Sequence, residues 1–197
     1  MKRIFDVIAS GLGLIVLSPL FLILAVWIKL DSKGPVFYRQ VRVGLHNKDF
    51  RIFKFRSMRV GADKGSLVTI GGRDPRITRS GYFIRKFKFD ELPQLINVFV
   101  GDMSLVGPRP EVRHYVDYWT DEQMHVLDVR PGITDPASIK FRNENELMEQ
   151  AEDPEKYYIE VIMQEKLKLY LEYVQNQSFW GDIGLIFKTF WVIVKER

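Results

Sequence analysis

The sequence predicts an α+β fold that is mainly helical and carries a small β-hairpin. Three observations lead to this class. They are an uncharged apolar run at residues 7–28, two segments of alternating hydrophobicity around a loop at 44–49, and a helical repeat of large apolar residues after Asp153. With 197 residues, one domain is the natural expectation.

The composition favours a basic protein with anionic partners. The formal net charge is +4 and the pI about 9.2, which suits phosphates or acidic lipid headgroups. Cysteine is absent, which excludes disulfides, thiolate metal sites and a cysteine nucleophile. The three histidines show no paired metal spacing, and the chain has no Gly-x-Ser-x-Gly turn, no Gly-x-Gly-x-x-Gly and no RNA-binding signature.

The apolar run at residues 7–28 is long enough to cross a membrane. As a helix, its roughly 22 residues would measure about 33 Å, close to the thickness of a bilayer's hydrocarbon core. A cleaved signal peptide would have a shorter apolar region and a small-residue cleavage site, and this run has neither. Ser18 and Pro19 interrupt the run near its middle. Proline removes a helical hydrogen bond and crowds the carbonyl of Ile15, at a cost of about 3 kcal/mol, and Ser18 can bond a freed backbone group.

Basic residues flank this run on both sides, whereas a spanning helix usually has its excess of Lys and Arg on one side. Charge and proline alone leave two alternatives open, a spanning helix and a re-entrant helix-break-helix that returns to the same face. The flanking cations are Lys2, Arg3, Lys29, Lys33, Arg39 and Arg42.

Residues 36–43 and 50–55 alternate like the two strands of a hairpin. In the second strand, alternation places Lys54 and Arg56 on the face opposite Phe53 and Phe55. A basic solvent face explains this spacing as well as a binding surface does. Residues 61–76 are expected to form a loop, and Gly71-Gly72 within it lacks the Gly-Lys-Ser/Thr ending of a phosphate loop.

The central stretch carries two adjacent carboxylates, Asp90 and Glu91, just before Pro93. Proline is tolerated in a first helical turn, so we expect both acids at or beside the start of a helix. Arg85 precedes them and Arg109 follows, and cations around two carboxylates suggest a site for a phosphorylated ligand, held in part through a metal ion. A capped surface helix with solvated charges is the alternative.

The remaining segments are predicted to be helices and one loop. Thr78 caps a helix that ends near residue 87, residues 111–128 form a half-polar helix, and residues 130–136 form a loop rich in proline and glycine. Asp153 caps a long core helix with proline at its first position. Residues 179–197 form an apolar helix that suits either the core or a membrane interface.

Five stretches of this chain together resemble the small monotopic phosphoglycosyl transferases, a family of bacterial sugar transferases. The stretches follow the family's order, cover nearly the whole chain and are specific in combination. They are the apolar N-terminus with Ser18-Pro19, Lys54-Phe55-Arg56-Ser57-Met58, Asp90-Glu91-Leu92-Pro93-Gln94-Leu95, residues 101–110 ending in Gly107-Pro108-Arg109-Pro110, and Arg130-Pro131-Gly132-Ile133-Thr134.

The resemblance implies transfer of a sugar 1-phosphate from a UDP-sugar to undecaprenyl phosphate with release of UMP, as the first step of membrane glycoconjugate synthesis. It implies ping-pong kinetics through a phosphosugar carried on Asp90, with Glu91 binding Mg²⁺. Basic side chains would hold the phosphates. These are Lys54, Arg56, Arg85, Arg109 and Arg130.

The resemblance also implies a re-entrant helix at residues 1–30, broken at Ser18 and Pro19, and a catalytic domain at residues 31–197 that ends in an amphipathic interfacial helix. The site would face the cytoplasm on the inner membrane, with anionic lipids as neighbours, no nucleic acid partner and a homodimer as one candidate assembly. We expect a minimal form of the family, without a large N-terminal membrane domain. A non-catalytic, basic membrane-surface binding protein is the alternative function.

Two departures from the family stand out. After Arg130-Pro131-Gly132-Ile133-Thr134 this chain continues Asp135-Pro136-Ala137-Ser138, where many members have Gly-Leu-Ala-Gln. Tyr170 stands where many members have an aspartate in the late helix. These differences put the transfer of sugar specificity in doubt and leave the core chemistry unaffected.

Overall fold

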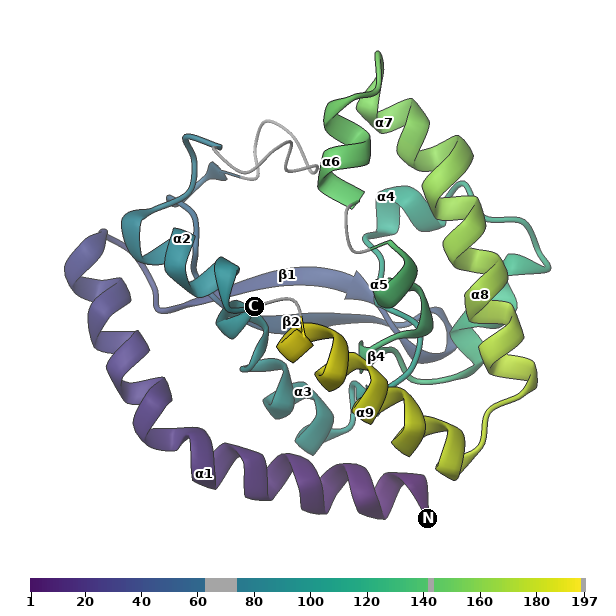
Figure 1. Ribbon diagram of the computed structural model, residues 1–197, viewed down its shortest axis with the longest axis horizontal. Helices are drawn as coiled ribbons and strands as arrows, with labels where there is room; N and C mark the ends of the chain where they lie inside the picture. Colours follow the sequence, from purple (N-terminus) through teal and green to yellow (C-terminus); the bar gives the residue numbers. More distant parts are fainter. Residues whose placement is uncertain (63–73, 142–143, 196–197) are drawn as a thin grey trace.

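The computed structural model describes residues 1–62, 74–141 and 144–195, and these residues are mainly helical (Figure 1). The predicted loop at 61–76, including Gly71-Gly72, falls largely outside them. The helices are α1 (Lys2–Asp31), α2 (Arg79–Lys86), α3 (Gln94–Val100), α4 (Arg113–Val116), α5 (Pro136–Lys140), α6 (Glu144–Glu149), α7 (Pro154–Tyr157), α8 (Met163–Gln175) and α9 (Phe179–Lys195). Tighter or wider turns are η1 (Leu45–Asn47), η3 (Phe89–Glu91), η4 (Gln123–Asp128) and the π-helical η5 (Tyr158–Ile162).

The predicted hairpin is confirmed and lies at the centre of the molecule (Figure 1). Strands β1 (Phe37–Val43) and β2 (Asp49–Phe55) pair antiparallel with Phe37 opposite Phe55. Phe55 is buried and Phe37 stacks on it with ring centroids 5.4 Å apart. The apolar face predicted by alternation therefore supports the strand that carries Lys54.

A second, parallel pair of strands was not predicted. Strands β3 (Ser104–Val106) and β4 (Gly132–Thr134) pair with Val106 opposite Thr134. The sequence of residues 130–136 reads as a loop because proline and glycine dominate it. Glycine is required here for close packing, since a Cβ on Gly132 would lie 2.1 Å from the backbone nitrogen of Gly107.

Helix α1 bends around one side of the molecule (Figure 1). Pro19 lies inside the helix, and the Ser18 hydroxyl donates to the carbonyl of Ile15 at 2.8 Å. That carbonyl is the one deprived of its usual partner by the proline. The predicted compensation by Ser18 is therefore confirmed.

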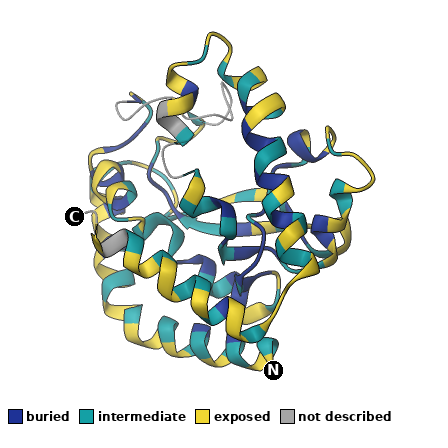
Figure 2. Cartoon of the chain, turned by 45° about the vertical axis from the view of Figure 1, so that its right-hand side comes forward, coloured by how far each residue is buried: buried dark blue, intermediate teal, exposed yellow. Residues whose placement is uncertain are grey.

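The inner face of α1 contacts the rest of the chain in both halves of the helix. In the N-terminal half, buried Asp6 accepts hydrogen bonds from the Ser104 hydroxyl at 2.8 Å and from the Leu105 amide at 3.1 Å. In the C-terminal half, Leu24 and Ile28 pack in one cluster with Phe55 and Ile84. The outer face is exposed and apolar (Figure 2), and its members include Ile4, Ile8, Leu12, Ile15, Val16, Leu22, Ile23, Val26, Trp27 and Leu30.

The C-terminal end of α1 is closed by Arg56. Its guanidinium donates to the carbonyls of Ile28, Ser32, Lys33 and Pro35 at distances between 2.7 and 3.4 Å. The Arg56 side chain is buried, and since three of these carbonyls follow the last residue of α1, its bonds fix the turn that leads from α1 to β1.

Two other helices start as their caps predict. Thr78 accepts a hydrogen bond from the Gly81 amide at the start of α2. Asp153 accepts one from the Lys156 amide at the start of α7, which continues through η5 into α8. Within this long element Met163, Leu167 and Tyr170 are buried, as the predicted helical repeat requires.

The prediction of one helix over residues 111–128 is wrong. The segment divides into α4 and η4 with a turn between them. Thr120 and Gln123 form a reciprocal capping box, in which the Thr120 hydroxyl accepts from the Gln123 amide and the Gln123 side chain accepts from the Thr120 amide. This box starts a new helical turn and ends the previous one.

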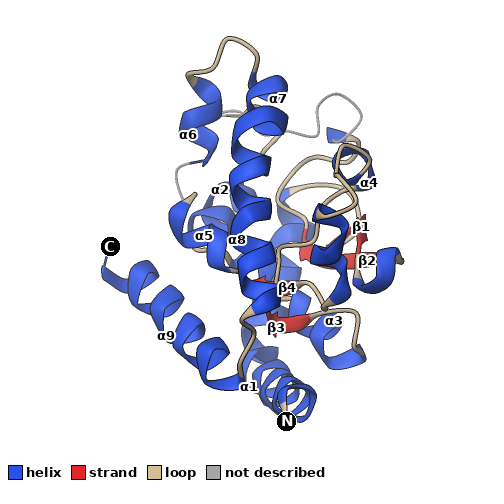
Figure 3. Ribbon diagram, turned by 90° about the vertical axis from the view of Figure 1, so that its right-hand side faces the viewer, coloured by secondary structure: helices blue, strands red, loops and turns tan. Residues whose placement is uncertain are grey.

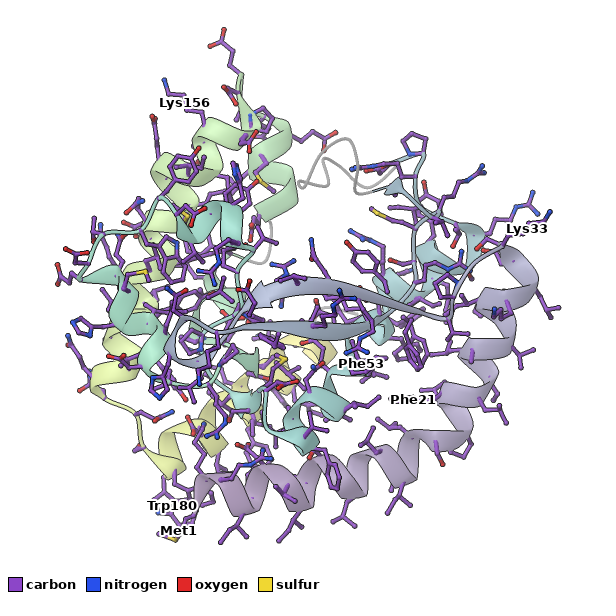
Figure 4. All side chains as sticks on the ribbon, turned by 180° about the vertical axis from the view of Figure 1, so that it is seen from behind. Met1, Phe21, Lys33, Phe53, Lys156 and Trp180 are labelled. Carbon is purple, nitrogen blue, oxygen red and sulfur yellow. The ribbon has the colours of Figure 1, made fainter. Side chains whose placement is uncertain are left out.

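The last helix, α9, begins beside the N-terminal end of α1 and leads away from it (Figure 3). Figure 4 places Trp180 next to Met1, and the Phe5 and Phe179 rings lie 5.6 Å apart. Asp182, near the start of this helix, is buried in an ion pair with Lys2. The exposed face is apolar, with Trp180, Phe187, Phe190 and Trp191.

Candidate active site

A pocket of about 1530 Å³ lies between the hairpin, the η3 turn, the β4–α5 junction, α8 and α9. Its polar wall includes Lys54 from β2, Asp90 and Glu91 from η3, and Arg109 after β3. These residues are up to 55 positions apart in the sequence, and the fold brings them to one place. The volume is ample for a nucleotide-sized ligand.

Glu91 lies between two cations. The Lys54 ammonium donates to Glu91 Oε1 at 3.1 Å, and the Arg109 guanidinium donates to both carboxylate oxygens, with the Oε2 contact at 3.4 Å. Burial acts to raise the pKa of Glu91, but Arg109 and Lys54 outweigh it and hold that pKa well below its usual range. Glu91 is therefore a stable carboxylate that orients both cations.

Asp90, the neighbouring residue, has the opposite environment. Its Oδ1 atom is buried, and within the described residues no donor lies in hydrogen-bonding distance of it. Burial and the charge of Glu91 raise the pKa of Asp90, and the charges of Lys54 and Arg85 only partly oppose this. An anionic oxygen without hydrogen bonds is a better nucleophile than one that is fully solvated or paired.

The η3 turn presents both carboxylates through its backbone. Lys88 precedes it in the left-handed conformation at φ 58°, an uncommon state for a residue other than glycine. Phe89 stacks on Phe87 with ring centroids 5.7 Å apart, which fixes the side of the turn away from the pocket. Asp90 and Glu91 lie just before α3, as predicted, but Pro93 is the N-cap, and no side chain in the described part of the chain caps this helix. Asp90 is thus not engaged in capping.

The parallel strands position Arg109. The Gly107 amide donates to the Thr134 carbonyl at 3.0 Å, and the Gly132 amide donates to the Pro108 carbonyl at 2.8 Å. The two residues just before Arg109 are therefore held by backbone bonds rather than by flexible side chains. Glu91 and burial set the pKa of Arg109 in opposite directions, and the Glu91 charge prevails, so the pKa is raised.

The other predicted phosphate-binding residues occupy three different settings. Arg85 lines the pocket, and its charge reaches Asp90. Arg56 touches the pocket, but its guanidinium is engaged by the four carbonyls at the end of α1. Arg130 lies away from the pocket wall and donates from Nε to the Gly101 carbonyl at 2.9 Å. The structure brings Lys54, Arg85 and Arg109 together around Asp90 and gives Arg56 and Arg130 contacts that support the backbone.

Sequence reasoning missed a second polar group in the same pocket. Asp135 follows β4 directly, and its Oδ1 atom accepts a hydrogen bond from the Tyr170 hydroxyl at 3.1 Å. Glu111 accepts from the Tyr158 hydroxyl and from Arg42. The Asp-Pro pattern that revealed the cap at Asp153 also occurs at Asp135, and applying it there would have predicted a helix start beside the Gly132 strand.

The predicted magnesium site has oxygen ligands but is incomplete by itself. Among residues 1–62, 74–141 and 144–195, no three His, Asp or Glu side chains cluster as a metal site. Mg²⁺ in phosphate-transfer sites usually takes one or two carboxylates and completes its shell with water and substrate phosphates. The unpartnered Asp90 oxygen and the adjacent Glu91 carboxylate fit that arrangement.

Comparison with known proteins identifies the family of this chain. Residues 1–196 match the family described as bacterial sugar transferase. The chain belongs to this family. The resemblance seen in the sequence is thereby confirmed, and in this family member the motif residues Lys54, Asp90, Glu91 and Arg109 converge on one pocket.

Three relatives illustrate the range of the family. A UDP-N-acetylgalactosamine-undecaprenyl-phosphate N-acetylgalactosaminephosphotransferase of Aeromonas hydrophila is 41% identical over 96% of this chain and 42% of its own length. A UDP-glucose:undecaprenyl-phosphate glucose-1-phosphate transferase of Klebsiella pneumoniae is 39% identical over 95% of this chain and 39% of its own length. The uncharacterized sugar transferase EpsL of Bacillus subtilis is 38% identical over 96% and 85%. The chain thus spans about two fifths of the length of the first two relatives.

Proposed function

We propose that this chain transfers a sugar 1-phosphate from a UDP-sugar to undecaprenyl phosphate and releases UMP. The observation that carries the proposal is the buried, unpartnered Asp90 oxygen beside Lys54, Arg85 and Arg109 in one pocket. The names of the relatives, which specify UDP-sugars and undecaprenyl phosphate, support the same substrates.

In the first step an Asp90 oxygen attacks the phosphorus that carries the sugar. The new bond joins Asp90 to that phosphorus, the bond to the bridging oxygen breaks, and UMP leaves with the electron pair. Phosphoryl transfer depends on in-line positioning and on charge neutralisation. Lys54 and Arg109, held in place by Glu91, supply positive charge to the phosphate oxygens without having to reorganise.

In the second step a phosphate oxygen of undecaprenyl phosphate attacks the phosphosugar on Asp90. This frees the Asp90 carboxylate and forms the diphosphate-linked sugar. The pocket supports such an acceptor, since its lining continues from Asp90 to apolar side chains of α1 and α9, including Phe5, Ala9 and Ile186. A polyprenyl tail can follow this apolar side while its phosphate reaches the polar wall.

Glu91 would hold Mg²⁺ together with phosphate oxygens of the donor. When bound, the ion would neutralise negative charge on the donor diphosphate. Lys54 and Arg109 already share Glu91, so the protein's own part is to keep this carboxylate ionised and oriented.

We further propose that α1 is re-entrant and that both of its ends lie on the cytoplasmic face of the bacterial inner membrane. Helix α1 is long and apolar enough to cross a membrane. However, Asp6 near one end and Ile28 near the other are fastened to the same body of the chain. The inner face is partly polar and the outer face apolar, the reverse of a surface helix in water. The exposed aromatic side chains of α9 fit the adjoining membrane interface.

A UMP-release assay tests the reaction. The protein is incubated with a panel of UDP-sugars, Mg²⁺ and undecaprenyl phosphate, and UMP is quantified. We expect release with at least one donor. Without acceptor, labelled UMP should exchange into that UDP-sugar, because a covalent intermediate allows the first step to reverse. Release without exchange would contradict the Asp90 intermediate, and binding without release from any donor would favour a non-catalytic membrane-surface protein.

Cysteine labelling tests the topology, and the chain contains no cysteine of its own. One reporter cysteine is placed in an extension before Met1 and another by Lys33→Cys, and each is treated with a membrane-impermeant reagent in intact spheroplasts. We expect no labelling of either. In a Ser18→Ala/Pro19→Ala background a straight helix of spanning length becomes favourable, and the N-terminal reporter should become partly labelled. Labelling of either site in the otherwise native chain would contradict re-entry.

A further inference from the structure

Asp135 is almost completely buried, at 1% exposure, although it lies at the start of a short surface helix. Its Oδ1 atom accepts three hydrogen bonds, from the Ala137 amide at 2.9 Å, the Ser138 amide at 2.8 Å and the Tyr170 hydroxyl at 3.1 Å. One oxygen therefore provides the whole cap of α5.

The other oxygen, Oδ2, is enclosed, and in the described part of the chain it has no hydrogen-bond donor. A buried carboxylate oxygen is normally paired. Asp153 makes the contrast clear. It has the same Asp-Pro sequence and caps α7 through one oxygen, but it is exposed and water can satisfy the other. Capping therefore does not explain why Asp135 is buried.

The position of Asp135 indicates which part of a bound donor would lie beside its Oδ2 atom. The residue follows Thr134, whose partner in the parallel ladder is Val106, so Asp135 and Arg109 leave the same end of the β3–β4 pair. Both side chains line the pocket. A donor whose phosphates lie at Arg109 places its neighbouring groups beside Asp135.

A carboxylate interacts favourably with only some of the groups that a bound donor could place beside Asp135. It repels phosphate oxygens and accepts hydrogen bonds from hydroxyl and amide N–H groups. In a UDP-sugar these donors are on the sugar, on the ribose and at uracil N3–H, and UMP retains all of them except those of the sugar. The sugar is bonded directly to the phosphate that Asp90 attacks, and Asp90 is in the same pocket as Asp135.

We propose that Asp135 is a specificity-determining residue whose Oδ2 atom accepts a hydrogen bond from a hydroxyl or acetamido N–H of the donor sugar. This inference rests on the proposed function. It concerns recognition of the sugar alone, so UMP, which lacks the sugar, serves as the internal reference.

The test uses Asp135→Asn in the full chain. Asparagine caps a helix as well as aspartate, so Oδ1 keeps its three donors while a donating NH₂ group replaces Oδ2. The kcat/KM for the donor that the unmodified protein prefers should fall about 10-fold to 100-fold, because the sugar loses its acceptor. The order of preference among UDP-sugars should change, and inhibition by UMP should stay within about twofold.

Asp153→Asn is the matched control, since it makes the same change at an exposed Asp-Pro cap. It should leave kcat/KM for each UDP-sugar and the inhibition by UMP unchanged. Asp135→Ser is the second variant. Serine also caps helices but offers no second carboxylate oxygen, so it should give the same loss even if the asparagine variant folds poorly.

Two results would overturn the proposal. One is an equal loss of UMP affinity, which would mean that Asp135 acts on the ribose or through Arg109. The other is an unchanged preference among sugars in both variants. Failure of the proposed function is distinguishable, because the unmodified protein would then release no UMP from any UDP-sugar.

Discussion

The two sides of the η3 turn show how adjacent carboxylates acquire different chemistry. On one side, Glu91 is paired with Lys54 and Arg109, and its pKa is held well below the usual range by these cations against the effect of burial. On the other side, the Oδ1 atom of Asp90 is enclosed and has no donor among the described residues, and burial and the charge of Glu91 raise the pKa of Asp90. Pairing produces a residue that orients its neighbours, and the lack of pairing produces one that can react.

The largest expected effect comes from Asp90→Asn. It keeps the shape of the side chain and removes the nucleophile, so we expect kcat to fall by about 10⁴-fold or more. Asp90 caps no helix, and the fold should survive the change. UMP release measured beside a circular dichroism spectrum tests this. Residual activity within about tenfold of the unmodified protein would contradict the covalent mechanism.

Glu91→Gln comes next. It removes the shared partner of Lys54 and Arg109 and weakens the proposed Mg²⁺ site, so kcat/KM should fall by about 10²-fold to 10³-fold. Titration with Mg²⁺ should give a weaker apparent affinity for the metal. Glu165→Gln is the control, since Glu165 pairs with Lys140 and Lys168 on the surface and should contribute little. Unchanged metal affinity in an inactive Glu91→Gln protein would assign Glu91 another role.

A smaller effect is expected from Arg109→Lys. Lysine keeps the charge but loses the planar fork that contacts both oxygens of Glu91, so kcat/KM should fall about 10-fold to 100-fold. Steady-state kinetics with the preferred UDP-sugar provide the measurement. The same substitution at Arg113, which pairs with exposed Asp49, is the control. Equal effects at both positions would show that the fork of Arg109 is unimportant.

The smallest effects are on stability, and they have opposite signs for the two acids. Because the pKa of Asp90 is raised, its charge destabilises the fold above the ordinary aspartate pKa, and Asp90→Asn should unfold a few degrees higher at pH 7. This gain should disappear as the pH falls and the native Asp90 becomes protonated. Because the pKa of Glu91 is lowered, Glu91→Gln should be less stable at pH 7, and the difference should shrink in acid as Glu91 itself is protonated.

Thermal unfolding in detergent with EDTA measures both effects without bound metal. If Asp90→Asn and Glu91→Gln shifted the unfolding temperature in the same direction at pH 7, the proposed difference between the environments of Asp90 and Glu91 would be contradicted.

Features that depend on neighbouring residues could be read from the sequence. The alternation of apolar and polar residues predicted the β1–β2 hairpin, and the capping residues Thr78 and Asp153 predicted where two helices begin. The Ser18 bond to the Ile15 carbonyl also follows from local helix geometry. Spacing alone could not separate a reactive site at Asp90 from a solvated helix cap, and the family's motif order was needed to favour the site.

Contacts between residues distant in sequence determined the features that local sequence patterns did not reveal. Asp182 is buried against Lys2, 180 positions away, and no local pattern indicates that contact. Residues 130–136 looked like a loop and contain a strand, because a three-residue parallel strand is too short to show alternation. Arg56 alternates with Lys54 along the chain, and only the structure shows that its guanidinium donates to carbonyls at residues 28–35 at the edge of the pocket.

The sequence by itself determined the class of fold, the helix caps, the hairpin and the identity of the motif residues, since periodicity and capping act over a few positions. Only the tertiary structure decided that Glu91 is paired, that Asp90 Oδ1 has no donor among the residues described, and that Asp135 shares their pocket. The physical reason is that burial and charge proximity depend on segments distant in sequence. Asp90 and Glu91 are neighbours in the chain, and what distinguishes them is which distant side chains reach each one.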